Sequence, residues 1–319
     1  MPVVGWLILS LAGVAAIVWG AEAFAEHVSA ASVRLGVSVF ALAILLAGAE
    51  PEELATSVVA SLRHAPGIAL GDVIGANVAI CLVALGVGAG LATLPFERSV
   101  RRYALAGLPC GILAAAISWD GLVTRFEGLV LVLTYLLFIT IIWRLERHPP
   151  ALGETAELAE AEHDATTGAR TRIGREFGLI ILGVVAMAGG ATALVEGIRR
   201  LTDIEARQVQ LGLIVVGFAT AFELVVLAWS AARRGITTAV VAGVIGSFTY
   251  NVTMTLGAGA LARPLHVHDA AQLHRPWIAM LLALGLVLLL ARRHQQLARR
   301  EGLILLAGYP LFVLLVLLH

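Results

Sequence analysis

Long apolar segments alternate with short polar ones along the whole chain. The apolar segments of the first half cover residues 3–24, 35–62, 67–91, 103–119 and 126–143, and those of the second half cover 177–198, 208–232, 236–262, 277–291 and 302–318. Each is close to the ~20 residues that a helix needs to cross a bilayer. The pattern predicts ten transmembrane helices, five in each half.

The composition agrees with an integral membrane protein. Of 319 residues, 59% are hydrophobic and 14% are charged, and the mean hydropathy is +0.91. So few polar residues cannot cover a water-soluble globule of this size, so the sequence predicts an all-α, multi-pass membrane protein whose surroundings are the lipid bilayer. The formal net charge is zero and no basic cluster is interleaved with aromatic residues, which excludes a nucleic-acid partner.

A polar stretch separates the two halves. It runs from Glu146 to Arg175, contains several acidic residues and few large apolar ones, and is typical of a flexible linker. The expected organisation is therefore a first half at 1–145, a linker at 146–175 and a second half at 176–319. The linker is too short for a folded regulatory domain.

The distribution of arginine predicts the orientation. All 22 basic residues are arginine, and 15 of them fall on the side of the membrane that includes the linker, against 7 on the other side. By the positive-inside rule the linker is cytoplasmic and both termini are outside. The expected location is the plasma (inner) membrane of a prokaryote.

The two halves of the chain are copies of each other. Glu53 aligns with Glu223 at an offset of 170 residues, and after one inserted residue Gly75 aligns with Gly246 at an offset of 171. Because each copy contains five spans, the second copy must enter the membrane in the opposite sense. The sequence thus predicts two inverted five-helix repeats, and in transporters of this plan the substrate binds near the midplane on interrupted helices.

Three carboxylates lie inside an apolar segment of the first copy. Glu50, Glu52 and Glu53 surround Pro51, and charged groups at such depth are costly, so they mark a functional site. Pro51 removes a backbone donor and leaves carbonyl groups free to face a cavity. Carboxylates with free carbonyls suit Ca²⁺, which takes six to eight oxygen ligands. Glu50 and Glu53 are three residues apart and are expected to share a helix face, with Glu52 about 100° away.

The second copy repeats this spacing with different chemistry. Thr220 and Glu223 are also three residues apart, and a hydroxyl stands where the first copy has Glu50. We expect Glu53 and Glu223 to bind one cation from the two sides of the repeat.

At this point the chain resembles the cation/Ca²⁺ exchanger superfamily of sodium/calcium and proton/calcium antiporters. The segment from Gly48 to Leu54 is similar to the family motif Gly-Thr-Ser-Leu-Pro-Glu-Leu, with Glu53 at the liganding glutamate. The segments Gly71–Asn77 and Gly246–Asn251 resemble the two segments that carry Gly-Ser, which places Ser247 and Asn251 at liganding positions. The resemblance implies a ten-helix fold that exchanges Ca²⁺ for Na⁺ or H⁺, with access by movement of spans 1 and 6 against the other helices.

The first copy departs from the family pattern. Ala49, Glu50 and Ala76 replace residues with hydroxyl groups, and Ile80 replaces a polar ligand. The lost oxygens help to form Na⁺ sites in sodium/calcium members. The gained carboxylates repel one another, so the counter-ion can be H⁺ as well as Na⁺.

The expected cation-binding residues come from both copies. They are Glu53, Glu223, Glu50, Thr220, Ser247, Asn251, Glu52 and Asn77, of which Glu53, Glu223 and Glu50 are the expected direct metal ligands. The protein is expected to be no enzyme and to hold no tightly bound cofactor, since its Ca²⁺ and its Na⁺ or H⁺ are transported.

Several alternatives stay open. The acids could lie at a helix end in water with Pro51 in the first turn, and a relative of this family could bind cations without moving them. Glu52-Glu53 also evokes the motif of glutamate intramembrane proteases, but Ser57 stands where that motif has arginine. A histidine cluster in an outer loop could bind a metal; it consists of His266, His268, Asp269 and His274.

Overall fold

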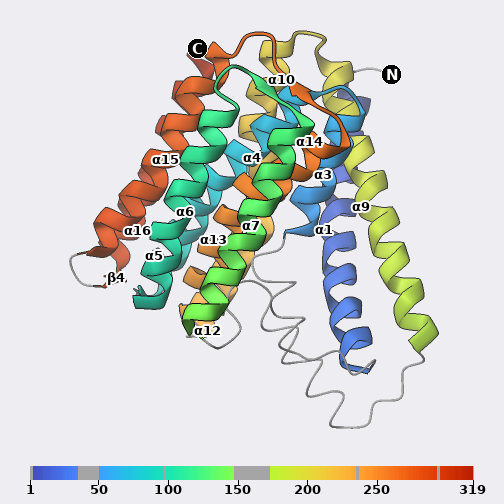
Figure 1. Cartoon of the computed structure of the whole chain (residues 1–319). Helices are drawn as coiled ribbons and strands as arrows, with labels where there is room; N and C mark the ends of the chain where they lie inside the picture. Colours follow the sequence, from blue (N-terminus) through green and yellow to red (C-terminus); the bar gives the residue numbers. More distant parts are fainter. Residues whose placement is uncertain are drawn as a thin grey trace.

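The computed structural model describes residues 3–34, 50–96, 98–146, 173–234, 237–292 and 295–318. It is a bundle of long helices that run roughly side by side (Figure 1). In this part of the chain, eight helices are long and apolar enough to cross a membrane by length and composition.

The first half contains the spans expected from the hydropathy pattern. They comprise α1 (Val3–Arg34), α3 (Pro51–Leu62), α4 (Pro66–Ala79), which continues through the π-helical segment η1 (Ile80–Ala84) into α5 (Leu85–Leu91), α6 (Arg98–Ile117) and α7 (Arg125–Glu146). Of the segment expected at 35–62, residues 35–49 lie outside the described part. Helix α1 extends ten residues past the expected end at residue 24, because its polar last turns continue the helix beyond the apolar run.

The second half repeats this order with more interruptions. It comprises α9 (Ile173–Leu201), then α10 (Glu205–Leu211), η2 (Gly212–Val216), α11 (Gly217–Thr220) and α12 (Phe222–Arg234) as one broken span, α13 (Thr237–Tyr250), η3 (Asn251–Thr255) and α14 (Leu256–Ala262) as another, and α15 (Ala271–Arg292) and α16 (Arg299–Leu317). Most of the expected linker, from residue 147 to residue 172, is outside the described residues.

The repeat predicted from the sequence is visible in the backbone. The π-helical segments η1 and η3 are related by an offset of 171 residues, and so are the short helices that follow them, α5 and α14. Both termini lie at the upper end of the bundle in Figure 1, whereas α7 ends and α9 begins at the lower end. Each half therefore crosses the bundle an odd number of times, as an inverted repeat requires.

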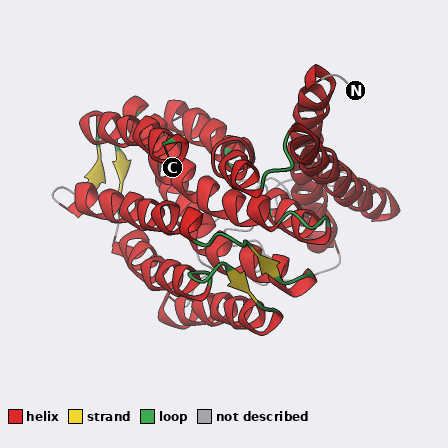
Figure 2. Ribbon diagram, turned by 90° about the horizontal axis from the view of Figure 1, so that it is seen from above, coloured by secondary structure: helices red, strands yellow, loops and turns green. Residues whose placement is uncertain are grey.

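Two short strand pairs connect the halves at their loops. β1 (Leu94–Pro95) pairs with β4 (Gln296–Leu297), and β2 (Leu122–Val123) pairs with β3 (Leu265–His266), both antiparallel. Figure 2 shows these as two separate pairs on different parts of the bundle. Each pair joins a loop of one repeat to a loop of the other, so the two copies are tied together outside the helices.

Helices α1 and α9 pack closely against each other at one side of the bundle (Figures 1 and 2). A Cβ atom on Gly13 would lie 2.6 Å from the carbonyl oxygen of Gly190, and one on Gly20 would lie 2.7 Å from that of Gly183. The same distances hold in the reverse direction. The prediction that these four glycines permit close contact is confirmed, but it is wrong for Gly189, whose added Cβ would meet nothing within 4 Å.

Candidate functional site

The acids of the first repeat lie at the start of α3. Glu50 is the residue before the helix, Pro51 occupies the first helical position, and the amide of Leu54 donates to the Glu50 carbonyl at 3.0 Å. Proline suits this position because its missing N–H would have no helical partner there. The alternative of Pro51 in a first turn is thus correct for the backbone.

These acids are not in water. Glu50 is 7% exposed, and Glu52 and Glu53 are each 1% exposed. The expected common face of Glu50 and Glu53 is wrong, because Glu50 precedes the helix and is not on its surface. Glu52, expected to point away, is as deeply buried as Glu53 and close enough to Glu50 to interact with it electrostatically.

The second repeat is broken at the matching place. Helix α11 ends at Thr220, Ala221 forms a turn and α12 begins at Phe222, which places Glu223 in the first turn of α12. No proline causes this break; the π-helical segment η2 precedes it, and such segments are frequent at functional sites. Glu223 is half-buried and near enough to Glu50, Glu52 and Glu53 for electrostatic interaction. The two half-sites expected from the repeat therefore meet.

Ser247 and Asn251 face this cluster from the span formed by α13 and η3. The hydroxyl of Ser247 donates to Oε1 of Glu50 and is also 3.0 Å from the Gly243 carbonyl oxygen. Asn251 is fully buried beside Glu53, and its Oδ1 accepts a 3.3 Å hydrogen bond from Thr255. Ser247 does connect two helices, as a packing role would require, but the group it contacts is a carboxylate of the site.

Asp72 is the member of the site that sequence reasoning missed. It lies on α4, is 0% exposed, and its Oδ1 accepts a 2.9 Å hydrogen bond from the Thr220 hydroxyl. Electrostatic interaction also links it to Glu53. The signal in the sequence was an acid within an apolar segment, which by itself favours a functional role. Helix packing or capping was the favoured interpretation of this residue.

Asn77 stands apart from these contacts. It is 0% exposed, and both atoms of its amide group lack a hydrogen-bond partner among the described residues. It follows Ala76, the repeat equivalent of Ser247, and so points about 100° away from the position that faces the cluster.

The carboxylates have little compensation from the protein. In the part of the chain that the structure describes, no arginine or histidine forms an ion pair with Glu50, Glu52, Glu53 or Asp72. Buried oxygens without a hydrogen-bond partner there include Glu52 Oε1, both Glu53 carboxylate oxygens and Asp72 Oδ2. Buried charges of one sign are costly unless a counter-charge or a proton neutralises them. The arrangement is thus suited to hold cations.

The carboxylates alone do not form a finished metal cage. No three acidic, histidine or cysteine side chains of the described residues gather closely enough to hold a metal ion by themselves. Hydroxyl, amide and backbone oxygens must complete the coordination of any bound ion, as Ca²⁺ coordination by six to eight oxygens allows.

The histidine cluster of the outer loop serves other contacts. The His274 ring stacks on Trp119 with centroids 4.1 Å apart, and its Nε2 is 2.8 Å from the Trp119 carbonyl oxygen. His268 Nδ1 lies 3.3 Å from Glu205 Oε1 instead. The described residues contain no metal-holding group here either, so the alternative of a histidine metal site has no support.

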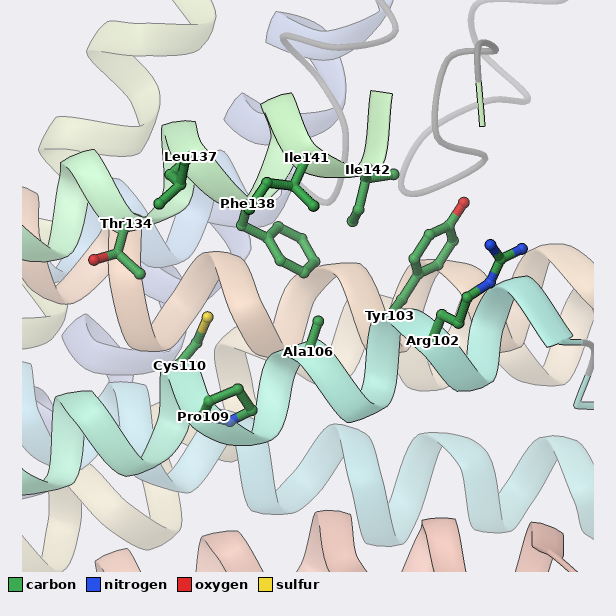
Figure 3. Close-up of a pocket in the computed structure, with 10 residues that line it drawn as sticks. All are labelled: Arg102, Tyr103, Ala106, Pro109, Cys110, Thr134, Leu137, Phe138, Ile141 and Ile142. Carbon is green, nitrogen blue, oxygen red and sulfur yellow. The ribbon is translucent and has the colours of Figure 1, made fainter. Parts of the chain in front are cut away.

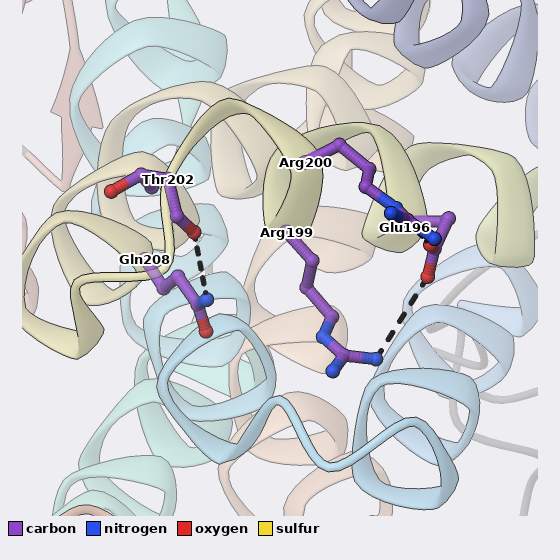
Figure 4. Close-up of polar contacts among 5 residues, drawn as sticks. All are labelled: Glu196, Arg199, Arg200, Thr202 and Gln208. Atoms are coloured by element: carbon purple, nitrogen blue, oxygen red, sulfur yellow. Dashed lines mark hydrogen bonds and ion pairs between the residues drawn. The ribbon is translucent and has the colours of Figure 1, made fainter.

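Glu196, the repeat partner of Glu26, is also outside the site. Its Oε1 is 2.7 Å from Arg200 Nε and its Oε2 is 3.8 Å from an Arg199 nitrogen. Figure 4 shows this group near the end of α9, where the Gln208 amide also bonds the Thr202 carbonyl at 3.0 Å. The interpretation of Glu196 as an interfacial residue agrees with these contacts.

Two inverted halves around a buried acidic cluster define a secondary cation transporter. A family model described as sodium/calcium exchanger protein matches residues 5–144 and 175–318. The chain belongs to the sodium/calcium exchanger protein family and is a multi-pass cation/Ca²⁺ antiporter. This confirms the expected family, fold class and function, and it favours neither the non-transporting relative nor the protease.

Relatives from several prokaryotes match nearly the whole chain. Membrane protein MJ0091 of Methanocaldococcus jannaschii is 26% identical over 293 residues, which cover 92% of this chain and 89% of the relative. Inner membrane protein YrbG of Escherichia coli is 23% identical, with coverage of 94% and 93%. The sodium/calcium exchanger MaX1 of Methanosarcina acetivorans is 37% identical over 99 residues, or 30% of this chain and 28% of that one.

Solved structures agree on the fold. The sodium-calcium exchanger NCX_Mj soaked with Na⁺ and Sr²⁺ superposes with a TM-score of 0.63 at 22% identity, and the match covers 98% of both chains. The ten-helix, inverted-repeat architecture predicted from the sequence is thereby confirmed.

Proposed function

We propose that this antiporter exchanges Ca²⁺, or a related divalent cation, for Na⁺ or H⁺ at the cluster between the repeats. Glu53 and Glu223 are the central ligands, and Glu50 adds charge or carries an exchanging proton. Thr220, Ser247 and Asn251 supply neutral oxygens, whereas Glu52 and Asn77 complete the surroundings. Asp72 joins this set as a further carboxylate.

The observation that carries this proposal is the set of buried, unpartnered carboxylate oxygens. Glu52, Glu53 and Asp72 come from two helices of the first repeat, and all three carry such an oxygen. Acids that are dehydrated and lack cationic side chains are expected to bind a cation strongly. Several carboxylates with neutral oxygens favour a hard divalent ion over a monovalent one.

The choice of counter-ion follows from the asymmetry of the repeats. Ser247 and Asn251 of the second repeat correspond to Ala76 and Ile80 of the first at an offset of 171 residues. Both first-repeat residues are fully buried and carry no side-chain oxygen. Fewer neutral oxygens and more carboxylates support protons as the exchanged ions, with Na⁺ as the second possibility.

The proposed orientation places the linker in the cytoplasm and both termini outside, in the plasma membrane of a prokaryote. The excess of arginine at the linker side supports it. The proposed organisation keeps residues 1–145 and 176–319 as the two repeats and 146–175 as the linker. Movement of α1 with α9 against the other helices opens the site alternately, and the glycine contacts between them support a unit that moves together.

The test is uptake of ⁴⁵Ca²⁺ into proteoliposomes, driven in parallel by an outward Na⁺ gradient and by a pH gradient. Uptake under the pH gradient alone assigns H⁺ as counter-ion, and uptake under the Na⁺ gradient assigns Na⁺. The Glu53→Gln/Glu223→Gln variant is the negative control, and Glu196→Gln is the matched control for loss of an acid outside the site. Absence of flux for any cation, with binding retained, would overturn the proposal in favour of a non-transporting relative.

A further inference from the structure

A groove between α6 and α7 lies outside the cation site. It has a volume of about 250 Å³ and is lined by residues of both helices. Figure 3 shows the two sets of side chains facing each other, with Arg102 and Tyr103 at one end and Thr134 and Cys110 at the other. The groove is therefore an elongated cleft that follows the direction of the helices.

The walls of the groove are apolar and open outward. On α6, Ala106 and Cys110 are one turn apart and too small to fill the space in front of α7. On α7, Leu137 is 59% exposed and Ile141 is 47% exposed, while Phe138 between them is buried. In a membrane protein such an exposed apolar surface contacts hydrocarbon. The groove thus offers an acyl chain a recess deeper than the flat side of a helix.

One end of the groove lies at the level of the lipid headgroups. Arg101 and Arg102 are in the first turn of α6, and Arg144 is in the last turn of α7. Trp143 beside it is 40% exposed, and both tryptophan and arginine mark the membrane interface. From Arg102 to Cys110 the groove spans eight residues, or roughly 12 Å at 1.5 Å per residue. This approaches half of the ~30 Å hydrocarbon core, the depth of one leaflet.

We propose that the groove binds one anionic phospholipid from the leaflet on the linker side. An acyl chain lies between Ala106 and Phe138, and the phosphate group is held at Arg102, with Arg101 and Arg144 adding positive charge. Basic pockets between transmembrane helices are suited to anionic headgroups. A zwitterionic lipid fits the same apolar recess but gains less from the arginines, so the groove selects by headgroup charge.

The experiment is native mass spectrometry of the purified full chain after equilibration with equimolar phosphatidylglycerol and phosphatidylcholine. We expect the wild type to retain phosphatidylglycerol preferentially. Arg102→Gln is expected to lower that preference about fivefold, the ratio that corresponds to about 1 kcal/mol per arginine near a membrane surface. Ala106→Phe fills the recess and is expected to lower retention of both lipids.

The matched control is Arg300→Gln, which removes the same charge near the start of α16 at the same end of the bundle. It should retain the wild-type preference. Thermal melting of each variant checks the fold, and Ala106→Leu replaces the phenylalanine variant if that one melts early. Equal losses in Arg102→Gln and Arg300→Gln, or full lipid retention with the recess filled, would overturn the proposal.

Discussion

The Ser247 hydroxyl of α13 donates a hydrogen bond to Oε1 of Glu50, the residue that precedes α3. The two residues are 197 positions apart and belong to opposite repeats. This contact brings the hydroxyl of one copy to the added carboxylate of the other. It joins the two halves of the chain at the centre of the proposed site.

Removal of this hydroxyl should weaken Ca²⁺ binding. Ser247→Ala is expected to raise the Ca²⁺ concentration for half-maximal flux by roughly tenfold to a hundredfold, because a hydrogen bond to a charged group contributes about 1.5–3 kcal/mol. The measurement is ⁴⁵Ca²⁺ uptake over a range of Ca²⁺ concentrations. Ser118→Ala is the control, since Ser118 is equally buried but bonds the Ala114 carbonyl far from the site. Equal effects of both changes would contradict a specific role.

Neutralisation of either central glutamate should abolish exchange. Glu53→Gln and Glu223→Gln keep the size of the side chain but remove the charge that attracts a divalent cation. Ca²⁺ uptake is expected to fall to the level of empty liposomes, while Glu196→Gln stays active. A Glu223→Gln protein with normal uptake would remove the central claim about the site.

Asp72 should contribute to ion binding although it is not part of the glutamate motifs. Asp72→Asn retains an oxygen that can accept the Thr220 hydrogen bond, so the fold is expected to persist. The loss of one negative charge should reduce the rise in melting temperature that Ca²⁺ produces, since that rise depends on the ligand concentration relative to Kd. Thermal melting with and without Ca²⁺ measures it. Asp269→Asn, in the outer loop, is the control and should show the wild-type rise.

Neighbouring glycines of α9 should respond in opposite ways to the same substitution. Gly190→Ala places a Cβ 2.6 Å from the Gly13 carbonyl oxygen, so α1 and α9 must separate, at a cost of about 1–3 kcal/mol for overpacking. Gly189→Ala meets nothing within 4 Å and should be neutral or stabilising by up to about 1 kcal/mol, because alanine favours helix. Melting temperatures measure both, and a lower value for the Gly189 variant would contradict this packing.

The spans could be predicted well because the bilayer acts on each segment separately. Segments such as 67–91 must be apolar over a minimum length whatever their neighbours are. Segments that tolerate polar turns at their ends were less accurate: α1 continues to Arg34, ten residues past the expected end at residue 24. The apolar pattern reports the hydrocarbon core, and a helix can continue into the interface beyond it.

The acids of the site were predictable for the same reason, but their mutual arrangement was not. Glu53 and Glu223 stood out as charges in apolar sequence related by a repeat. The expected pairing of Glu50 with Glu53 on one helix face failed because α3 begins at Pro51. Helical spacing applies only within a helix, and the position of the break is set by the surrounding packing.

The sequence by itself determined the membrane class, the inverted repeat and the two glutamates that the repeat relates. These depend on local polarity and on internal similarity, which the chain carries in its order of residues. Only the tertiary structure decided that Asp72 joins the cluster through Thr220 and that Ser247 reaches Glu50. Such contacts depend on how helices are rotated and on the π-helical segments, which change the direction of every side chain after them.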